Sequence, residues 1–61
     1  MKSKKMYKID DIVTDGEFTM KVVTILGDDE GGNWWYECAP VDFWVPFPRE
    51  FRQDRLKPAE L

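Results

Sequence analysis

The chain has 61 residues, with twelve acidic and nine basic side chains, no histidine and a single cysteine, Cys38. This length allows one small domain at most, and one cysteine without histidine supplies neither an intramolecular disulfide nor an ordinary zinc site to stabilise it. The net charge of −3, with Lys21 the one basic residue between positions 10 and 30, argues against a protein that mainly binds a phosphate backbone.

Residues 1–6 form a basic segment that we expect to be a flexible tail before the folded domain. This segment resembles the start of a signal peptide, but no apolar stretch follows it, and no run in the chain is long enough to span a bilayer. We therefore expect a cytoplasmic protein without a membrane partner. Residues 7–58 are assigned to a single folded domain and residues 59–61 to a C-terminal tail.

From residue 7 onward, the pattern is that of short strands separated by turns. Residues 7–13 predict a strand with a two-residue acidic interruption in its middle. Residues 18–26 (FTMKVVTIL) form the clearest strand, since they are rich in β-branched side chains and contain neither Gly nor Pro. Residues 34–41 predict its antiparallel partner, and the polar, glycine-rich loop 27–33 connects the two strands into a hairpin.

The C-terminal third continues this pattern with shorter elements. Residues 44–48 predict an extended edge segment, because two prolines in it lack amide donors. Residues 48–54 predict one helical or 3₁₀ turn, and residues 55–57 predict a short closing strand that ends at Pro58. Together these elements predict an all-β fold: a small, strongly curved barrel of five strands with a 3₁₀ turn before the last strand.

Alternation along the hairpin separates core positions from surface positions. In the first hairpin strand, an exposed Lys21 places Met20 and Val22 inside, and a bulge near Val22 and Val23 would turn Ile25 inward as well. We expect the core to include Met20, Val22, Tyr36 and Leu56.

In the second hairpin strand, Glu37 is expected to face water. Its neighbours Trp34, Tyr36 and Cys38 then face the core, because successive side chains point to opposite faces. Trp35 shares the outer face with Glu37, so it is the ring that we expect, before any other, to be exposed.

The order of the elements resembles that of SH3-like barrels, and three short segments resemble one uncharacterised group of such proteins from bacteria and their phages. Residues 7–13 (YKIDDIV) are similar to the opening pattern aromatic-x-aliphatic-Gly-Asp-aliphatic-Val, with Asp10 in the position of the glycine. Residues 19–23 and 36–38 resemble the second and third strands of that group. Its C-terminal turn and last strand are matched by Phe51, Leu56 and Pro58. The resemblance implies a fold whose members bind peptides, nucleic acids or other subunits, and it selects none of these functions.

No group of residues in the sequence has the pattern of a catalytic or metal site. Adjacent carboxylates at positions 10 and 11 point to opposite faces of a strand, so they cannot readily share a proton. The acidic run at positions 28–30 lacks the spacing of a calcium loop, and Cys38 has no histidine to activate it. We therefore expect a protein that is not an enzyme and has neither a metal nor a cofactor.

Aromatic residues provide the strongest indication of a binding surface. Seven of the nine lie between Trp34 and Phe51. Each ring offers about 150–250 Å² for burial, which is more than so short a segment can hide. The predicted partner-binding residues are Trp35, Phe43, Trp44 and Phe47, with Arg49 and Arg52 beside them for an acidic partner. The alternative for the rings is a place in the core, and the alternative for the arginines is neutralisation by Glu50 and Asp54.

These features predict a small protein-interaction module whose exposed aromatic face binds another protein or a second copy of the chain. A bacterial or phage accessory or inhibitor protein would have this character. One alternative is a nucleic-acid-binding barrel in which the basic tail, Arg49, Arg52 and Arg55 contact phosphates, while Trp35 or Trp44 stacks on a base. The other alternative is a self-assembling structural subunit, because a second copy can cover unpaired strand edges and exposed rings.

Overall fold

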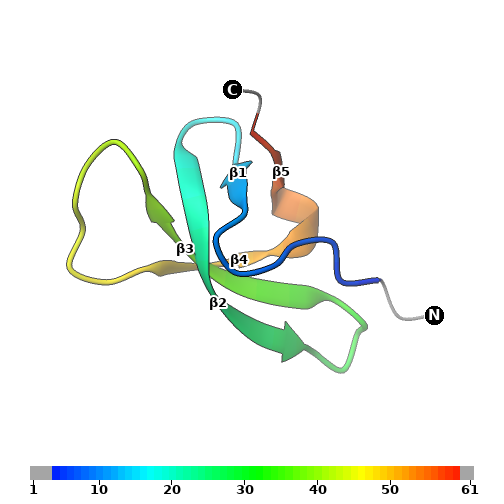
Figure 1. The fold of residues 1–61 in the computed structure, drawn as a ribbon. Coiled ribbons are helices and arrows are strands. Elements are labelled where there is room, and N and C mark those ends of the chain that lie inside the picture. Colours follow the sequence, from blue (N-terminus) through cyan, green and yellow to red (C-terminus); the bar gives the residue numbers. More distant parts are fainter. Residues whose placement is uncertain (1–3, 60–61) are drawn as a thin grey trace.

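The computed structural model describes residues 4–59, which form one five-stranded antiparallel sheet and one 3₁₀ turn (Figure 1). The elements in chain order are β1 (Ile12–Thr14), β2 (Thr19–Asp28), β3 (Trp34–Pro40), β4 (Arg49–Arg52), the 3₁₀ turn η1 (Gln53–Arg55) and β5 (Lys57–Pro58). The sheet order is β4-β3-β2-β1-β5, so β4 and β5 are its two edges and the sheet is not closed. The predicted all-β class, the five strands and the 3₁₀ turn before the last strand are confirmed. The outer parts of the two predicted tails, 1–3 and 60–61, lie outside the described residues.

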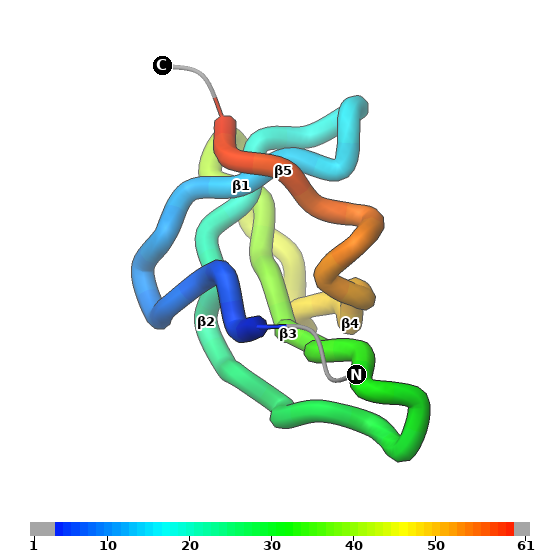
Figure 2. Tube along the Cα trace, turned by 90° about the vertical axis from the view of Figure 1, so that its right-hand side faces the viewer, coloured from blue at the N-terminus to red at the C-terminus, as the bar shows by residue number. Residues whose placement is uncertain are grey.

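The long β2–β3 hairpin organises the sheet and extends beyond the other strands (Figure 2). Its register shifts between Val22 and Thr24, which is the bulge predicted near this position. The shift pairs Ile25 with the inward-facing Tyr36, so Ile25 packs against the core. A second shift follows Ile25, and β2 then runs on to Asp28, which shortens the predicted connecting loop to residues 29–33.

The core lies on one face of this hairpin. Tyr36 is fully buried, and its ring meets that of Tyr7 edge to face with 5.5 Å between the centroids. The Tyr7 hydroxyl donates a hydrogen bond to the Leu56 carbonyl over 3.2 Å, which connects the N-terminal segment to the chain just before β5. The predicted burial of Met20, Val22, Tyr36, Cys38 and Leu56 is confirmed.

A buried polar cluster centred on Gln53 joins three parts of the chain. The Tyr36 hydroxyl donates to the Gln53 Oε1 over 2.6 Å, and the same oxygen accepts the Met6 amide over 2.9 Å. The Gln53 Nε2 donates to the Lys4 carbonyl over 2.8 Å. Gln53 is a buried polar residue, and these contacts satisfy both ends of its amide. The cluster thereby fixes residues 4–6 against η1 and β3.

The predicted strand at residues 7–9 is wrong, because the backbone turns before β1 begins. Asp10 has a φ of 77°, and the Asp11 amide donates to the Lys8 carbonyl over 3.1 Å. A residue in the left-handed region ends an extended segment, and glycine adopts this conformation more readily than aspartate. The strand therefore begins only at Ile12.

The C-terminal predictions need three corrections. Residues 44–48 lie in no strand. The helical or 3₁₀ turn predicted for residues 48–54 is confined to η1, because residues 49–52 form β4. β4 is extended because Phe51 pairs with Tyr36, a tertiary contact that a local pattern does not reveal. The closing strand is β5, displaced from the predicted residues 55–57.

Replacing Gln53 by leucine should lower the free energy of unfolding by about 1–3 kcal/mol, because it leaves the Tyr36 hydroxyl, the Met6 amide and the Lys4 carbonyl without their partner. Urea unfolding followed by tryptophan fluorescence measures the change. The exposed Arg55→Gln variant in the same turn is the control and should stay within about 0.5 kcal/mol of wild type. Superimposable curves for Gln53→Leu and wild type would show that the cluster does not stabilise the fold.

Candidate functional site

A groove of about 510 Å³ opens between the β1–β2 turn and the β3–β4 loop. These two connections lie at the same end of the antiparallel sheet. We call this feature the aromatic groove. Its apolar lining residues are Phe18, Met20, Cys38, Pro40, Phe43, Val45, Phe47 and Phe51. Its charged lining residues are Asp15, Glu17, Arg49 and Glu50.

Asp15 holds the β1–β2 turn that forms one wall of the groove. Its Oδ1 accepts the amides of Glu17 and Phe18, each over 2.9 Å, and the Thr14 hydroxyl accepts the Gly16 amide over 3.0 Å. Hydrogen bonds from the backbone amides of Phe18 and Glu17 lower the pKa of the Asp15 carboxyl. Asp15 is therefore ionised at neutral pH, and its bonds fix the start of the segment that carries the Phe18 ring.

Phe18 and Phe43 join the two walls. Their rings meet edge to face with 5.7 Å between centroids, although each ring is about half exposed. The contact follows from the hairpin, because the Val41 amide donates to the Thr19 carbonyl over 3.1 Å just beyond the β2–β3 ladder. This bond brings the residues before β2 beside those after β3.

The second wall is the β3–β4 loop, residues 41–48, which projects from the sheet as a wide arch (Figure 1). Phe47 lines the groove and is 77% exposed, and Trp44 in the same loop is 84% exposed. Soluble proteins seldom expose several large apolar side chains in one place unless something covers them. This loop therefore carries the largest exposed rings among the described residues.

The structure brings together three of the six predicted partner-binding residues, since Phe43, Phe47 and Arg49 all line the aromatic groove. Trp44 lies in the same loop without being one of the lining residues. The other two, Trp35 and Arg52, lie in a different part of the sheet, opposite each other on β3 and β4.

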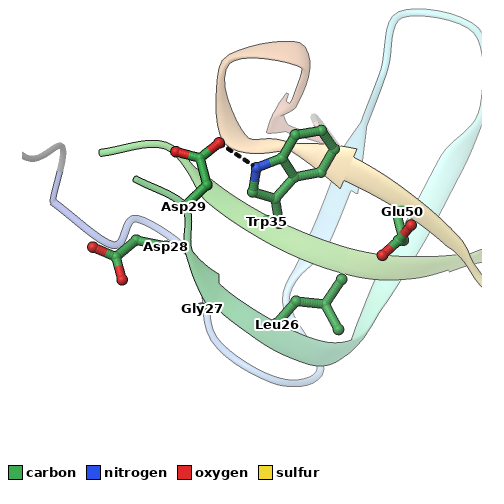
Figure 3. A pocket seen from close by; sticks show the side chains of 6 residues that line it. All are labelled: Leu26, Gly27, Asp28, Asp29, Trp35 and Glu50. Carbon is green, nitrogen blue, oxygen red and sulfur yellow. Dashed lines mark hydrogen bonds between the residues drawn. The ribbon is translucent and has the colours of Figure 1, made fainter. Parts of the chain in front are cut away.

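The expectation that the Trp35 ring is exposed is wrong. Its side chain is half-buried, because the indole Nε1 donates to the Asp29 Oδ2 over 2.9 Å and holds the ring against the hairpin (Figure 3). This hydrogen bond is the main cause that lowers the pKa of Asp29. Trp35 lines a second, shallower hollow of about 390 Å³ together with Leu26 and Glu50 (Figure 3).

The arginines at the two ends of β4 do not share one surface. Arg49 pairs with the inward-facing Cys38, whereas Arg52 pairs with Trp35 on the other face. The Arg52 Nε lies 2.7 Å from the Asp54 Oδ1, and this contact raises the pKa of Arg52 and lowers that of Asp54. Arg52 is therefore neutralised locally, while Arg49 belongs to the groove.

Sequence reasoning missed the wall that faces the predicted rings. The sequence predicts Phe18 at the start of a strand, and it predicts no place in a binding site for Asp15 or Glu17. The hairpin pattern indicates this contact. Met20 pairs with Pro40, and continuing the same register outward brings Phe18 close to Phe43. Extending the predicted ladder past its ends would have identified this contact.

Comparisons with models of protein families, with curated proteins and with solved structures give no match. No helix within residues 4–59 is long and apolar enough to cross a membrane. In the same part of the chain, no three His, Cys, Asp or Glu side chains form a group that could hold a metal ion. The function is therefore argued from the aromatic groove.

Cys38 lies beneath the groove and should react slowly with alkylating reagents. Burial raises the pKa of its thiol to about 11, so the reactive thiolate is scarce near neutral pH. At pH 8 we expect iodoacetamide to modify the native protein about a hundredfold more slowly than the urea-unfolded chain, as measured by mass spectrometry. Similar rates in both states would mean that solvent enters the groove as far as the core.

Proposed function

We propose that this chain is a non-enzymatic protein-interaction module of the SH3-like type, whose aromatic groove binds an apolar segment of another protein. The observation that carries the proposal is the collection of exposed rings at one end of the sheet, where Phe43 and Phe47 line a concave surface and Trp44 lies beside it. Concave, mainly apolar surfaces with a few polar groups are typical of binding sites. Five strands with a 3₁₀ turn before the last one support the SH3-like part of the proposal.

The exposed rings provide enough apolar surface to support binding. Phe43, Trp44 and Phe47 are 49%, 84% and 77% exposed. Together they leave roughly 400 Å² uncovered, which contributes about 10 kcal/mol when buried at about 25 cal/mol per Å². Association costs about 4–15 kcal/mol, so a partner that also buries apolar surface of its own can form a complex.

The shape of the groove suits an extended segment more than a folded domain. The two walls are loops at the end of the sheet, and the floor is formed by side chains of β2, β3 and β4. An extended chain laid between such walls can place alternate side chains against the rings. The acidic lining residues and the separation of Arg49 from Arg52 give less support to nucleic-acid binding.

Replacing Phe47 by alanine should weaken peptide binding about tenfold or more without changing the fold, because the ring is 77% exposed. Peptides are first selected from a random library displayed on phage, with wild-type protein as bait. Their dissociation constants for wild type and Phe47→Ala are then measured by fluorescence titration, and urea unfolding verifies that stability is unchanged.

Ile9→Ala is the matched control, since Ile9 is an exposed apolar residue outside the groove. It should leave the dissociation constant unchanged. The proposal fails if the selected peptides bind Phe47→Ala as tightly as wild type. A dimer that Phe47→Ala dissociates in sedimentation would assign the groove to a second copy of the chain instead.

A further inference from the structure

We infer that two copies of this chain associate through the open edge of β4, with Glu50 of each copy opposite Arg52 of the other. The inference concerns a strand edge, not the aromatic groove, and goes beyond the proposed function. The sheet has two edge strands, β4 and β5, which differ in what they offer to another strand. An edge strand exposes backbone donors and acceptors that can pair with a further chain.

The edge of β5 is protected by Pro58. The Ala59 amide donates to the Ile12 carbonyl over 3.2 Å, so Ala59 directs its backbone groups toward β1. Successive residues of an antiparallel ladder direct these groups to opposite sides, so Pro58, which pairs with Val13, faces away from β1. Because proline has no amide hydrogen, this two-residue strand offers no outward donor.

The register of the hairpin shows which way the backbone groups of β4 point. The Val22 amide donates to the Asp11 carbonyl and the Val22 carbonyl accepts the Asp10 amide, each over 2.9 Å. Val22 therefore directs its backbone groups away from β3. Its partner Cys38 then directs its own groups toward β4, where it pairs with Arg49.

Alternation along β4 assigns Glu50 and Arg52 to the open side. Arg49 and Phe51 bond to β3, whereas the amides and carbonyls of Glu50 and Arg52 point away from it. Arg52 has an extended backbone, with φ −77° and ψ 145°, so its carbonyl keeps the geometry of a strand. Within residues 4–59, β3 is the one strand that pairs with β4. The outward groups of β4 can therefore pair with a strand from another molecule.

The side chains of β4 are complementary to a second copy of themselves. A twofold axis through Phe51 sets two β4 strands antiparallel and places Glu50 of each copy opposite Arg52 of the other. In this register the outward backbone groups of the same two residues bond to each other across the axis. Both side chains lie on the face that carries Trp35, where Figure 3 shows the Glu50 carboxylate. Each carboxylate therefore meets a guanidinium of the second copy.

The charges already present in the sheet favour this pairing. Glu50 lies opposite Glu37 in the ladder with β3, and like charges in this position destabilise an antiparallel pair. No ion pair formed within residues 4–59 uses Glu50. Arg52 contacts Asp54 through its Nε, which leaves the other nitrogens of its guanidinium for a second carboxylate. A second copy thus supplies an attraction to Glu50 where β3 supplies a repulsion.

Phe51 supplies an apolar contact on the opposite face. It packs against the core and lines the aromatic groove. On the twofold axis it meets the same ring of the second copy, in the non-hydrogen-bonded position where facing side chains come closest. The strand is four residues long, so the interface is smaller than that of a stable dimer, and we expect a dissociation constant of about 10–500 µM.

The test reverses the two charges separately. Sedimentation equilibrium of the full-length chain between about 10 µM and about 1 mM measures self-association. Glu50→Arg and Arg52→Glu should each weaken it about tenfold or more, because each variant sets like charges opposite each other in both halves of the dimer. Glu30→Arg makes the same change in the exposed β2–β3 turn and should alter self-association less than about twofold.

Mixing the two variants provides the specific readout. An equal mixture of Glu50→Arg and Arg52→Glu should associate about as tightly as wild type, because each arginine then faces a glutamate in the mixed dimer. Native mass spectrometry identifies the mixed dimer by its mass. A loss of stability in either variant would not produce this recovery.

A synthetic chain with an N-methylated Glu50 amide keeps every side chain and removes one outward donor. It should lose self-association about tenfold or more while its urea unfolding curve stays that of wild type, because this amide points away from β3 in the single chain. Self-association equal to that of wild type would show that the edge of β4 is not the interface.

The outcomes separate this inference from the proposed function. A monomer at about 1 mM, or a dimer that the charge reversals leave intact, would overturn the inference and leave peptide binding in the aromatic groove unaffected. Loss of that dimer with Phe47→Ala would move self-association to the groove. Self-association through β4 without any peptide binding that depends on Phe47 would overturn the proposed function alone.

Discussion

The hydrogen bonds of the Gln53 side chain join residues 4–6, which belong to no strand, to the sheet at Tyr36. Backbone pairing connects β4 through β3, β2 and β1 to β5, but does not connect β4 back to β5. Gln53 lies in the turn between these two edges and also accepts the Met6 amide. These side-chain hydrogen bonds therefore hold the N-terminal segment against η1 and β3, in a sheet whose two edges are not joined by backbone pairing. In a domain this small, a satisfied buried network favours one arrangement of the core because its members bind at fixed distances.

The two register shifts in β2 determine which of its side chains face the core and where the ends of the hairpin lie. The shift after Val22 turns Ile25 inward, and the second shift displaces the end of the hairpin, where Trp35 meets Asp29. Bulges bend and twist a strand, so one continuous strand can contribute to the core along much of its length. At the other end, β2 begins beside the Phe18–Phe43 contact, and this places the aromatic groove away from the polar cluster at Gln53.

Most of the hairpin and core can be predicted from the sequence, because both depend on local alternation. Lys21 and Glu37 assign the faces of the two strands, and the aliphatic residues after Val22 require a bulge to remain covered. Trp35 could not be placed in this way, since its burial depends on a hydrogen bond across the turn. β4 likewise depends on pairing with β3, which local propensity does not encode. The aromatic groove was predicted in part: its rings lie in one sequence segment, but Phe18 reaches them from another.

The walls of the groove have a consequence for how this protein can change. Phe43, Val45 and Phe47 belong to a loop outside the backbone ladder, and Glu17 lies in a short turn. Substitutions at these positions would alter the proposed binding surface without removing a strand or opening the tyrosine core. On the proposed function, stability and binding specificity reside in different residues, so mutation could redirect the groove toward new ligands while the scaffold is preserved. A chain of 61 residues organised in this way is a compact starting point for laboratory evolution of binding proteins.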